Sequence, residues 1–219
     1  MAYARLGDSQ RGLAYLSRAR EAHERYNDRD GRIDTLLVTA TLWVEQGSID
    51  EAKTLLADAA ALVAVSGSIY DRIHMLVVQS LIGLREDDAI AAAQHAAEAR
   101  QLAEGQALVS YHVFATAIEA CARVLSGDIQ AGVMLATTAL GAVEAMEGSE
   151  YGIQVRAFCL QAVVDASDGD GLGASTAMTA HVCERSLRHV EKIAGFTRDP
   201  DLRASLYERA PVRYILEQA

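Results

Sequence analysis

The stretch Gly47-Ser48-Ile49-Asp50-Glu51-Ala52 decides the fold, because it has the pattern of a tight turn that opens a helix. Similar turns recur at steps of forty residues, at Gly7-Asp8, Asp87-Asp88 and Gly127-Asp128. Small or apolar residues follow each turn at fixed offsets of five, nine and twelve: Gly12, Ala52, Ala92 and Gly132, then Leu16, Leu56, Ala96 and Ala136, then Ala19, Ala59, Ala99 and Ala139. Repetition at a fixed period indicates a repeat architecture, here one of helical hairpins.

Between these turns the apolar residues follow helical spacing. The first helix of the second unit would carry on one face Ile33, Leu36, Leu37, Ala40 and Val44. The composition agrees, because the chain has two prolines and only 5% aromatic residues, whereas a β-sandwich needs frequent turn signals and β-branched or aromatic strands. Segment 27–31, rich in Asn and Asp, is predicted to be a loop.

These patterns predict an all-α fold, a right-handed α-solenoid of about five helix-turn-helix repeats with a C-terminal cap. The expected units lie near residues 1–30, 31–67, 68–105, 106–148 and 149–195, followed by capping helices in 196–219. Residues 1–7 have the pattern of the end of a helix whose beginning is missing. We therefore expect the chain to be part of a longer protein.

The last repeat and the cap depart from the simple period. The fifth unit fits if two residues are inserted before its turn, which puts Ala174, Met178 and His181 at the repeated positions. Asp199-Pro200 then has the pattern of a helix start, with proline in the first turn. The cap is expected to cover the open end of the fifth unit with Tyr207, Tyr214, Ile215 and Leu216.

The charge is negative and unevenly distributed. The net charge is −10, and residues 34–183 carry six basic and nineteen acidic side chains. This acidic segment would repel nucleic acid, so we expect no nucleic-acid partner. Two interpretations stay open: a surface that favours basic partners, and a solvated face that keeps an Ala-rich array soluble.

The apolar runs predict neither a membrane span nor a signal peptide. The longest uncharged run, residues 129–143, is shorter than the roughly 18–20 residues that a membrane helix needs. Cys121, Cys159 and Cys183 are odd in number and have no metal-site spacing, so we interpret them as reduced packing residues. A cytoplasmic protein without a membrane partner is therefore expected.

No motif points to catalysis. Gly169 to Ala174 has the letters of a dinucleotide fingerprint and partly those of a calcium loop, but it lacks the surrounding strand and the terminal glutamate that these sites require. His95 and Glu98 lie three residues apart without a second such pair. The sequence therefore predicts no catalytic residue, no metal and no cofactor, and the chain is not expected to be an enzyme.

A helix pair with this order of small and large residues resembles the tetratricopeptide repeat over about residues 1–195, in unit two at Gly47, Ala52, Leu56 and Ala59. The period of forty differs from the roughly thirty-four residues of that family. Longer-period arrays of this kind are similar to the C-terminal regions of large bacterial signalling proteins, such as multidomain serine/threonine kinases and signal-transducing ATPases. The resemblance implies a regulatory or sensor arm.

In such arrays the first helix of each unit lines the inner surface. The resemblance thus implies groove-facing candidates in units two and three, namely Asp34, Leu37, Thr41, Glu45, His74, Val77, Leu81 and Arg85. Our main hypothesis is a non-catalytic scaffold that binds a protein or peptide partner. The alternative is a domain that senses a small ligand in the concave groove, and self-association through the truncated first unit is a further hypothesis.

Overall fold

The computed structural model describes residues 3, 6–66, 68–146, 148–167 and 175–219, and their regular structure is entirely α-helical. The all-α prediction is thus confirmed for this part of the chain. The helices are α2 (Ser9–Arg25), α3 (Arg29–Gln46), α4 (Ile49–Ser66), α5 (Ile69–Arg85), α6 (Ala89–Gly105), α7 (Val109–Leu125), α8 (Ile129–Ala145), α9 (Gly152–Ser167), α10 (Thr176–Phe196), α11 (Pro200–Glu208) and α12 (Ala210–Glu217).

The helices from α2 to α8 begin twenty residues apart. Their first residues are Ser9, Arg29, Ile49, Ile69, Ala89, Val109 and Ile129. The forty-residue period is therefore two helices of nearly equal length. The loop predicted at 27–31 is wrong, since α3 already begins at Arg29. Asp28 caps this helix by accepting a hydrogen bond of 3.0 Å from the Gly31 amide, so the Asp-rich segment is a helix N-terminus.

The turns share one backbone geometry. Positive φ angles occur at the four repeated turn positions, Gly7, Gly47, Asp87 and Gly127, and also halfway between them at Asn27 and Ala107. The next residue then donates its amide to a carbonyl five residues earlier, as Ser48 does to Trp43 at 2.9 Å. This is the Schellman closure of a helix end. The same bond joins Asp28 to His23, Asp88 to Gly83, Leu108 to Ala103 and Asp128 to Arg123.

The small residues behind the turns permit close helix packing. Ala52, Ala92 and Ala96 are fully buried. At Gly132, an added Cβ would lie 2.7 Å from the carbonyl oxygen of Ala120 in the neighbouring helix. Side chains larger than hydrogen or methyl would push these helices apart, which explains why the repeat keeps Gly or Ala at offset five.

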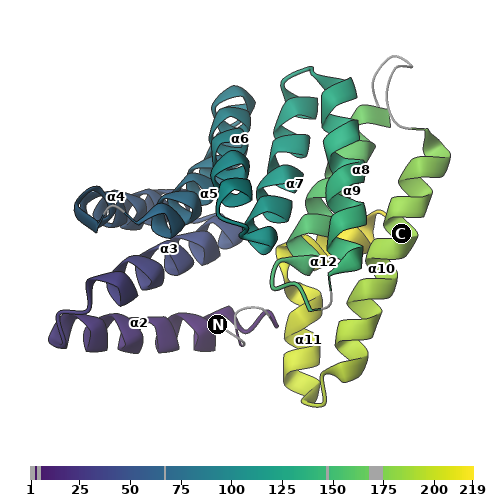
Figure 1. Cartoon of the computed structure of the whole chain (residues 1–219). Helices are drawn as coiled ribbons and strands as arrows, with labels where there is room; N and C mark the ends of the chain where they lie inside the picture. Colours follow the sequence, from purple (N-terminus) through teal and green to yellow (C-terminus); the bar gives the residue numbers. More distant parts are fainter. Residues whose placement is uncertain (1–2, 4–5, 67, 147, 168–174) are drawn as a thin grey trace.

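The helical hairpins pack side by side along the chain (Figure 1). Helix α3 contacts α5, α5 contacts α7, and α7 contacts α9, so these four helices form one continuous inner layer. Helices α2, α4, α6 and α8 each pack against their sequence neighbours in this layer. Most of the buried apolar side chains form one cluster that extends from Ile33 to Ile215.

The last repeat departs from the predicted register. The described part of the chain resumes after the α9–α10 connection at Ser175, so Ala174 lies outside it. His181 is exposed, whereas Val182 and Ser186 are buried. The reason is that α9 and α10 no longer begin twenty residues after the preceding helix, so a different face of α10 meets the core.

The C-terminal helices turn back onto the inner layer. Pro200 begins α11 as predicted, and the Asp199 side chain accepts amide hydrogen bonds from residues 201 and 202. Helix α12 packs against α9 and α10 and buries Val212 and Ile215 completely. Tyr207 and Tyr214 are partly buried against the core, but Leu216 is exposed, contrary to its predicted capping role.

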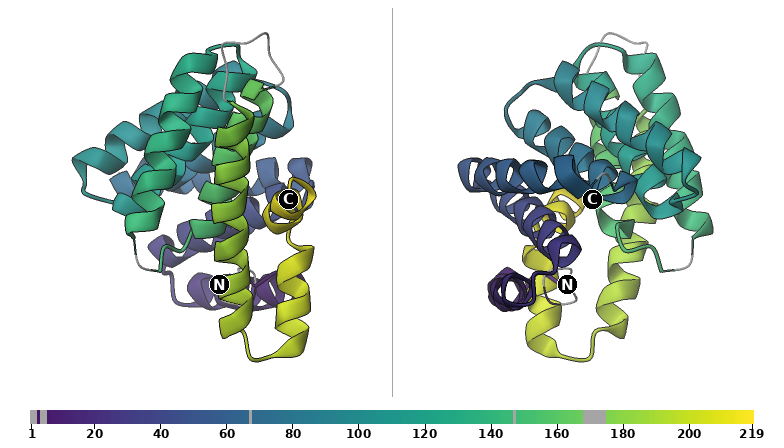
Figure 2. Two further views of the ribbon diagram at one scale, coloured as in Figure 1. Left: turned by 90° about the vertical axis from the view of Figure 1, so that its right-hand side faces the viewer. Right: turned by 60° about the vertical axis from the view of Figure 1, so that its left-hand side comes forward.

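The same helices reach the other end of the array. Both views in Figure 2 place α11 close to α2, and a Cβ at Gly7 would collide with the carbonyl oxygen of Ser205 in α11. The C-terminal segment therefore contacts the first turn of the chain as well as the last hairpin, which the sequence pattern did not predict.

The three cysteines belong to the hydrophobic core. All three cysteines are buried and unpaired, and burial raises the pKa of the Cys121 and Cys159 thiols. Cys183 donates to the carbonyl of Gln218, which ties α10 to the end of the chain. Among the described residues, no helix has both the length and the apolar character to cross a membrane.

Candidate functional site

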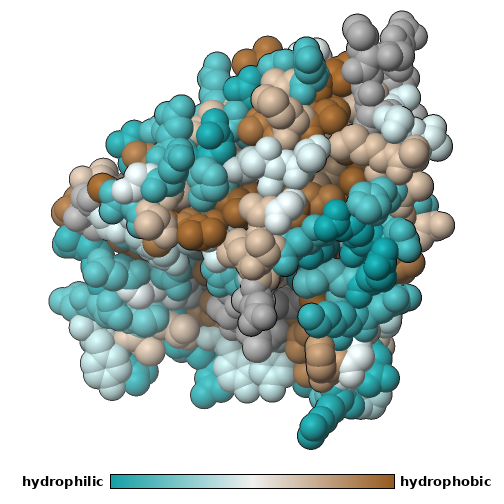
Figure 3. Space-filling view, turned by 45° about the vertical axis from the view of Figure 1, so that its right-hand side comes forward, coloured by the Kyte–Doolittle hydropathy of each residue, from teal (hydrophilic) through white to brown (hydrophobic). Residues whose placement is uncertain are grey.

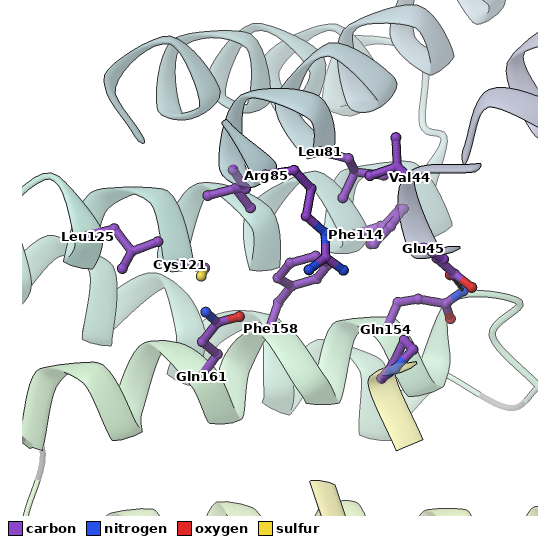
Figure 4. A pocket seen from close by; sticks show the side chains of 12 residues that line it. Val44, Glu45, Leu81, Arg85, Phe114, Cys121, Leu125, Gln154, Phe158 and Gln161 are labelled. Carbon is purple, nitrogen blue, oxygen red and sulfur yellow. Dashed lines mark hydrogen bonds between the residues drawn. The ribbon is translucent and has the colours of Figure 1, made fainter. Parts of the chain in front are cut away.

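Two adjoining cavities lie between the inner layer and the C-terminal segment. The larger has a volume of about 120 Å³ and the smaller about 40 Å³. Glu45, Phe114 and Gln154 line both cavities. Their walls thus come from α3, α5, α7 and α9, and Pro211 and Arg209 close them from the C-terminal side. Figure 4 shows the larger cavity from close by.

The structure places most of the sequence-derived candidates in these walls. Glu45, Leu81 and Arg85 line the larger cavity, and Thr41, Glu45, His74 and Val77 line the smaller one. The other two candidates are elsewhere. Leu37 is fully buried in the core, and Asp34 is more than half exposed, with its Oδ1 4.0 Å from Nδ1 of His74.

The candidates implied by the resemblance came from units two and three. Further lining residues lie in units four and five, at the same forty-residue step. Adding forty to His74 leads to Phe114 and then to Gln154. Adding forty to Leu81 leads to Cys121 and then to Gln161, and adding forty to Arg85 leads to Leu125. All five residues reached in this way line the larger cavity. Repetition was therefore a sufficient signal for the lining of units four and five.

A buried ionic network fixes the C-terminal wall. One oxygen of Glu45 accepts from Nε2 of Gln154 at 3.1 Å and from Nη2 of Arg209 at 3.0 Å. The other carboxylate oxygen lies 3.1 Å from the same guanidinium nitrogen. The Arg209 side chain is only 5% exposed. A charge this deeply buried needs its counter-ion, so the carboxylate holds Arg209 as a permanent wall rather than a movable lid.

Buried polar atoms of Gln154 and His74 on these walls have no hydrogen-bond partner among the residues that the structure describes. They are Oε1 of Gln154, a residue that is 9% exposed, and Nδ1 of His74, which is 5% exposed. The amide orientation of Gln154 follows from its partner, because a carboxylate accepts only from the NH₂ group. Burial lowers the pKa of His74 to about 4, so the ring is neutral near pH 7.

The larger cavity has mostly apolar walls, and the cation in its lining, Arg85, forms no ion pair with any residue that the structure describes. Leu81, Phe114 and Phe158 contribute hydrophobic surface. Arg85 extends from the end of α5 with its guanidinium directed into the space, toward Phe158 (Figure 4). Cys121 and Gln161 lie on one side of Arg85, and Glu45 lies on the other.

A third cavity of about 290 Å³ continues outward from this region. It shares Arg85, Phe158, Gln161 and Pro211 with the larger cavity. A second guanidinium, that of Arg213, also lines it, together with Tyr214 and Glu217. The space thus widens toward the surface between α9 and α12.

Aromatic contacts make the wall of the smaller cavity rigid. The rings of Tyr70 and Tyr111 lie 5.4 Å apart, and those of Tyr111 and Tyr151 lie 5.5 Å apart. Tyr151 stacks on Phe114 with 4.4 Å between ring centres. Offset and edge-on contacts of this kind stabilise by about 0.5–1.5 kcal/mol each. Because they join α5, α7 and the start of α9, the cavity wall is preorganised.

A buried thiol lies in the wall of the larger cavity. Cys121 is the nucleophilic side chain of the larger cavity, but burial raises its pKa and keeps it a thiol. No group of three or more metal-ligating side chains gathers within the described ranges. Glu98, which lies three residues after His95 in the sequence, pairs with Arg72. The glycine-rich segment 169–174 lies outside the described residues.

No family model matches the chain, and no curated protein matches it in sequence. The interpretation of the cavities therefore depends on their geometry and chemistry.

Proposed function

We propose that this chain is a non-catalytic binding module, a tetratricopeptide-like right-handed α-solenoid that takes a small ligand in its inner cavities. The observation that carries the proposal is the pair of cavities where α3, α5, α7 and α9 meet the C-terminal segment. Ligand pockets are typically apolar spaces with a few convergent polar groups. Leu81, Phe114 and Phe158 supply the apolar surface, and Arg85 and Gln154 the polar groups.

The closure of the inner face favours a small ligand over an extended peptide. In an open array this face would be a groove, but here Arg209 and Pro211 occupy it. Leu206, Val212 and Ile215 anchor the same segment in the core at 0% exposure. Removing it would expose these side chains at a cost of about 1.5–3 kcal/mol each, so a peptide cannot readily displace it.

A ligand at this place would act on the whole array. It would touch four inner helices and the C-terminal segment at once, so its binding would stabilise their relative positions. We propose that this change is the signal of a regulatory arm, which the resemblance to arrays of bacterial signalling proteins also suggests. A larger protein carrying this arm would respond to the altered curvature.

The test is ligand-dependent melting of the purified chain with a panel of small organic acids, amines and amides. A bound ligand at one hundred times its Kd stabilises by about 2.7 kcal/mol. Gln161→Phe would fill the cavity and remove this stabilisation, whereas Gln94→Phe, with the same ring on the exposed side of α6, would not. A panel without any stabilising compound, or stabilisation that survives Gln161→Phe, would refute the proposal.

A second candidate is the protein-interaction scaffold, favoured by a different surface. An apolar groove of about 260 Å³ runs beside α3 and is lined by Leu13, Leu16, Leu36, Trp43 and Leu55. Other exposed apolar side chains are scattered, and the hydrophobic areas in Figure 3 are interrupted by hydrophilic ones. A groove of connected apolar residues is thus the better docking surface.

Self-association is the form of this scaffold that can be tested directly. Sedimentation at increasing concentration should show a dimer that Leu13→Lys disperses. Trp43 lies in this groove and is the single tryptophan of the chain, so its emission should shift to shorter wavelength on association. A monomer with constant emission at all concentrations would exclude self-association through this groove.

A further inference from the structure

We infer that the inner cavity binds a small carboxylic acid with an apolar body of about six carbons, its carboxylate held by Arg85. The inference rests on the proposed function and gives the chemical class of the ligand. Four features carry it: an uncommitted guanidinium, the size of the apolar space, an unpartnered acceptor and the local balance of charge.

The cation that lines the larger cavity is Arg85. It makes no hydrogen bond or ion pair with the described residues, although it ends α5 next to Glu86, which pairs with Lys53. The carboxylate nearest to the cavity, Glu45, is already shared by Arg209 and Gln154. A guanidinium directed at an apolar space presents several donors in a plane and matches a carboxylate.

The volume limits the body of the ligand. An apolar cavity of about 150 Å³ is known to hold benzene, so the 120 Å³ here suits one small ring or a branched chain of similar size. Phe114 and Phe158 face this space from α7 and α9. A long acyl chain would not fit inside, whereas the adjoining cavity beside Arg213 leaves room for a charged head.

The unpartnered Oε1 of Gln154 adds a polar requirement. This acceptor is buried on the wall shared by both cavities, and an unsatisfied buried acceptor costs about 1–3 kcal/mol. A ligand with an N–H or O–H group next to its apolar body would satisfy it. Acids with such a donor should therefore bind more tightly than those without one.

The charges of the cavities favour an anion in spite of the acidic chain. Arg85 and Arg213 line the larger and outer cavities against Glu45 and Glu217, whereas Arg209 and Glu150 line the smaller cavity on the other side. Because Glu45 is neutralised by Arg209, the two guanidinium groups of the larger and outer cavities, those of Arg85 and Arg213, are balanced there by Glu217 alone. The net charge of these two cavities is therefore positive, although the whole chain has a net charge of −10. The preference for an anion is thus local.

The experiment compares three probes that share one phenyl ring: phenylacetate, phenylacetamide and phenethylamine. Methyl NMR of the full chain reports binding at the cavity through Leu81, Leu84 and Leu125, which line it. We expect phenylacetate to shift these methyl signals and to bind at least tenfold more tightly than the amide. The amine should bind more weakly than either.

Matched variants assign the effect to one side chain. Arg85→Gln should weaken phenylacetate at least tenfold and leave the amide unchanged. Arg72→Gln is the control, because Arg72 lies on the same helix but pairs with Glu98 at the surface. Equal loss in both variants, or no loss in Arg85→Gln, would overturn the inference.

Two further outcomes separate this inference from the proposed function. If the amide or the amine binds as tightly as the acid with the same methyl shifts, the carboxylate inference is wrong and the cavity remains a binding site. If no probe and no compound of the wider panel moves these signals, both fail. Tighter binding of acetyl-glycyl-phenylalanine than of mandelate, a small acid with the same ring and an O–H donor, would identify a peptide terminus as the source and overturn the small acid.

Discussion

His74 should make the stability of this protein fall as the pH is lowered through the range below 6.5. The side chain is 5% exposed, and its Nδ1 has no hydrogen-bond partner. The Oδ1 atom of Asp34 in α3 lies 4.0 Å away, and the ring of Tyr111 in α7 lies 5.6 Å away. Burial lowers the pKa of His74 to about 4, because the imidazolium would lose its hydration.

The sign and the size follow from proton linkage. An unfolded histidine takes up a proton below about pH 6.5, whereas folded His74 stays neutral until about pH 4. In this window the unfolded state holds the additional proton, so stability decreases as the pH falls. Each pH unit costs about 1.4 kcal/mol, which amounts to about 2–3 kcal/mol between pH 7 and pH 4.5.

The assay is urea unfolding of wild type and His74→Phe at both pH values. Asp34 and Asp71 have pKa values raised mainly by burial, which opposes the histidine effect, but both proteins share these groups. The variant should therefore lose about 2 kcal/mol less than wild type on acidification. His181→Phe, at an exposed position, should behave as wild type. Equal losses in wild type and His74→Phe would refute the reasoning.

Three further predictions concern stability and are checked by denaturant unfolding at pH 7. A double-mutant cycle of Glu45→Gln and Arg209→Met should give a coupling energy of about 2 kcal/mol, because the pair is buried and Nη2 of Arg209 lies 3.0 Å from Oε1 of Glu45. A coupling energy below about 0.5 kcal/mol would contradict the role of this pair. Gly132→Ala should destabilise the protein by about 1–3 kcal/mol, because a carbonyl oxygen lies 2.7 Å from the new Cβ. Gly141→Ala, with open space around it, should stabilise the protein by about 0.5–1 kcal/mol. A Gly132→Ala protein more stable than the Gly141→Ala protein would be inconsistent with the packing. Asp88→Ala should cost about 1 kcal/mol, because its side chain accepts a hydrogen bond of 3.0 Å from the first turn of α6, and an unchanged midpoint would show that this cap contributes nothing.

The candidate site was predictable as far as the repeat extends. Glu45 and Arg85 stand forty residues apart and line one cavity, as the implied inner positions require. Leu37 shows the limit, because it shares this face by spacing but is fully buried. Helical periodicity gives the direction of a side chain to within about one position, and this is too coarse to separate the groove from the core.

The sequence alone determined the helices and the turns between them, because both depend on local chemistry. Residues that accept a positive φ angle, followed by a capping side chain, stop one helix and start the next within a few positions. Asp87 and Asp88 illustrate this, the first with a φ of 59° and the second as the cap of α6. Such signals act within one turn and need no information from distant parts of the chain.

Only the tertiary structure decided that the inner face is closed. Arg209 meets Glu45 across 164 positions of sequence, and Gly7 meets α11 at the opposite end of the chain. These contacts depend on the rotation between successive hairpins, which accumulates along the array, and on the changed register after α9. No local pattern encodes that sum, so the cavity and its uncommitted Arg85 emerge only when the whole chain is folded.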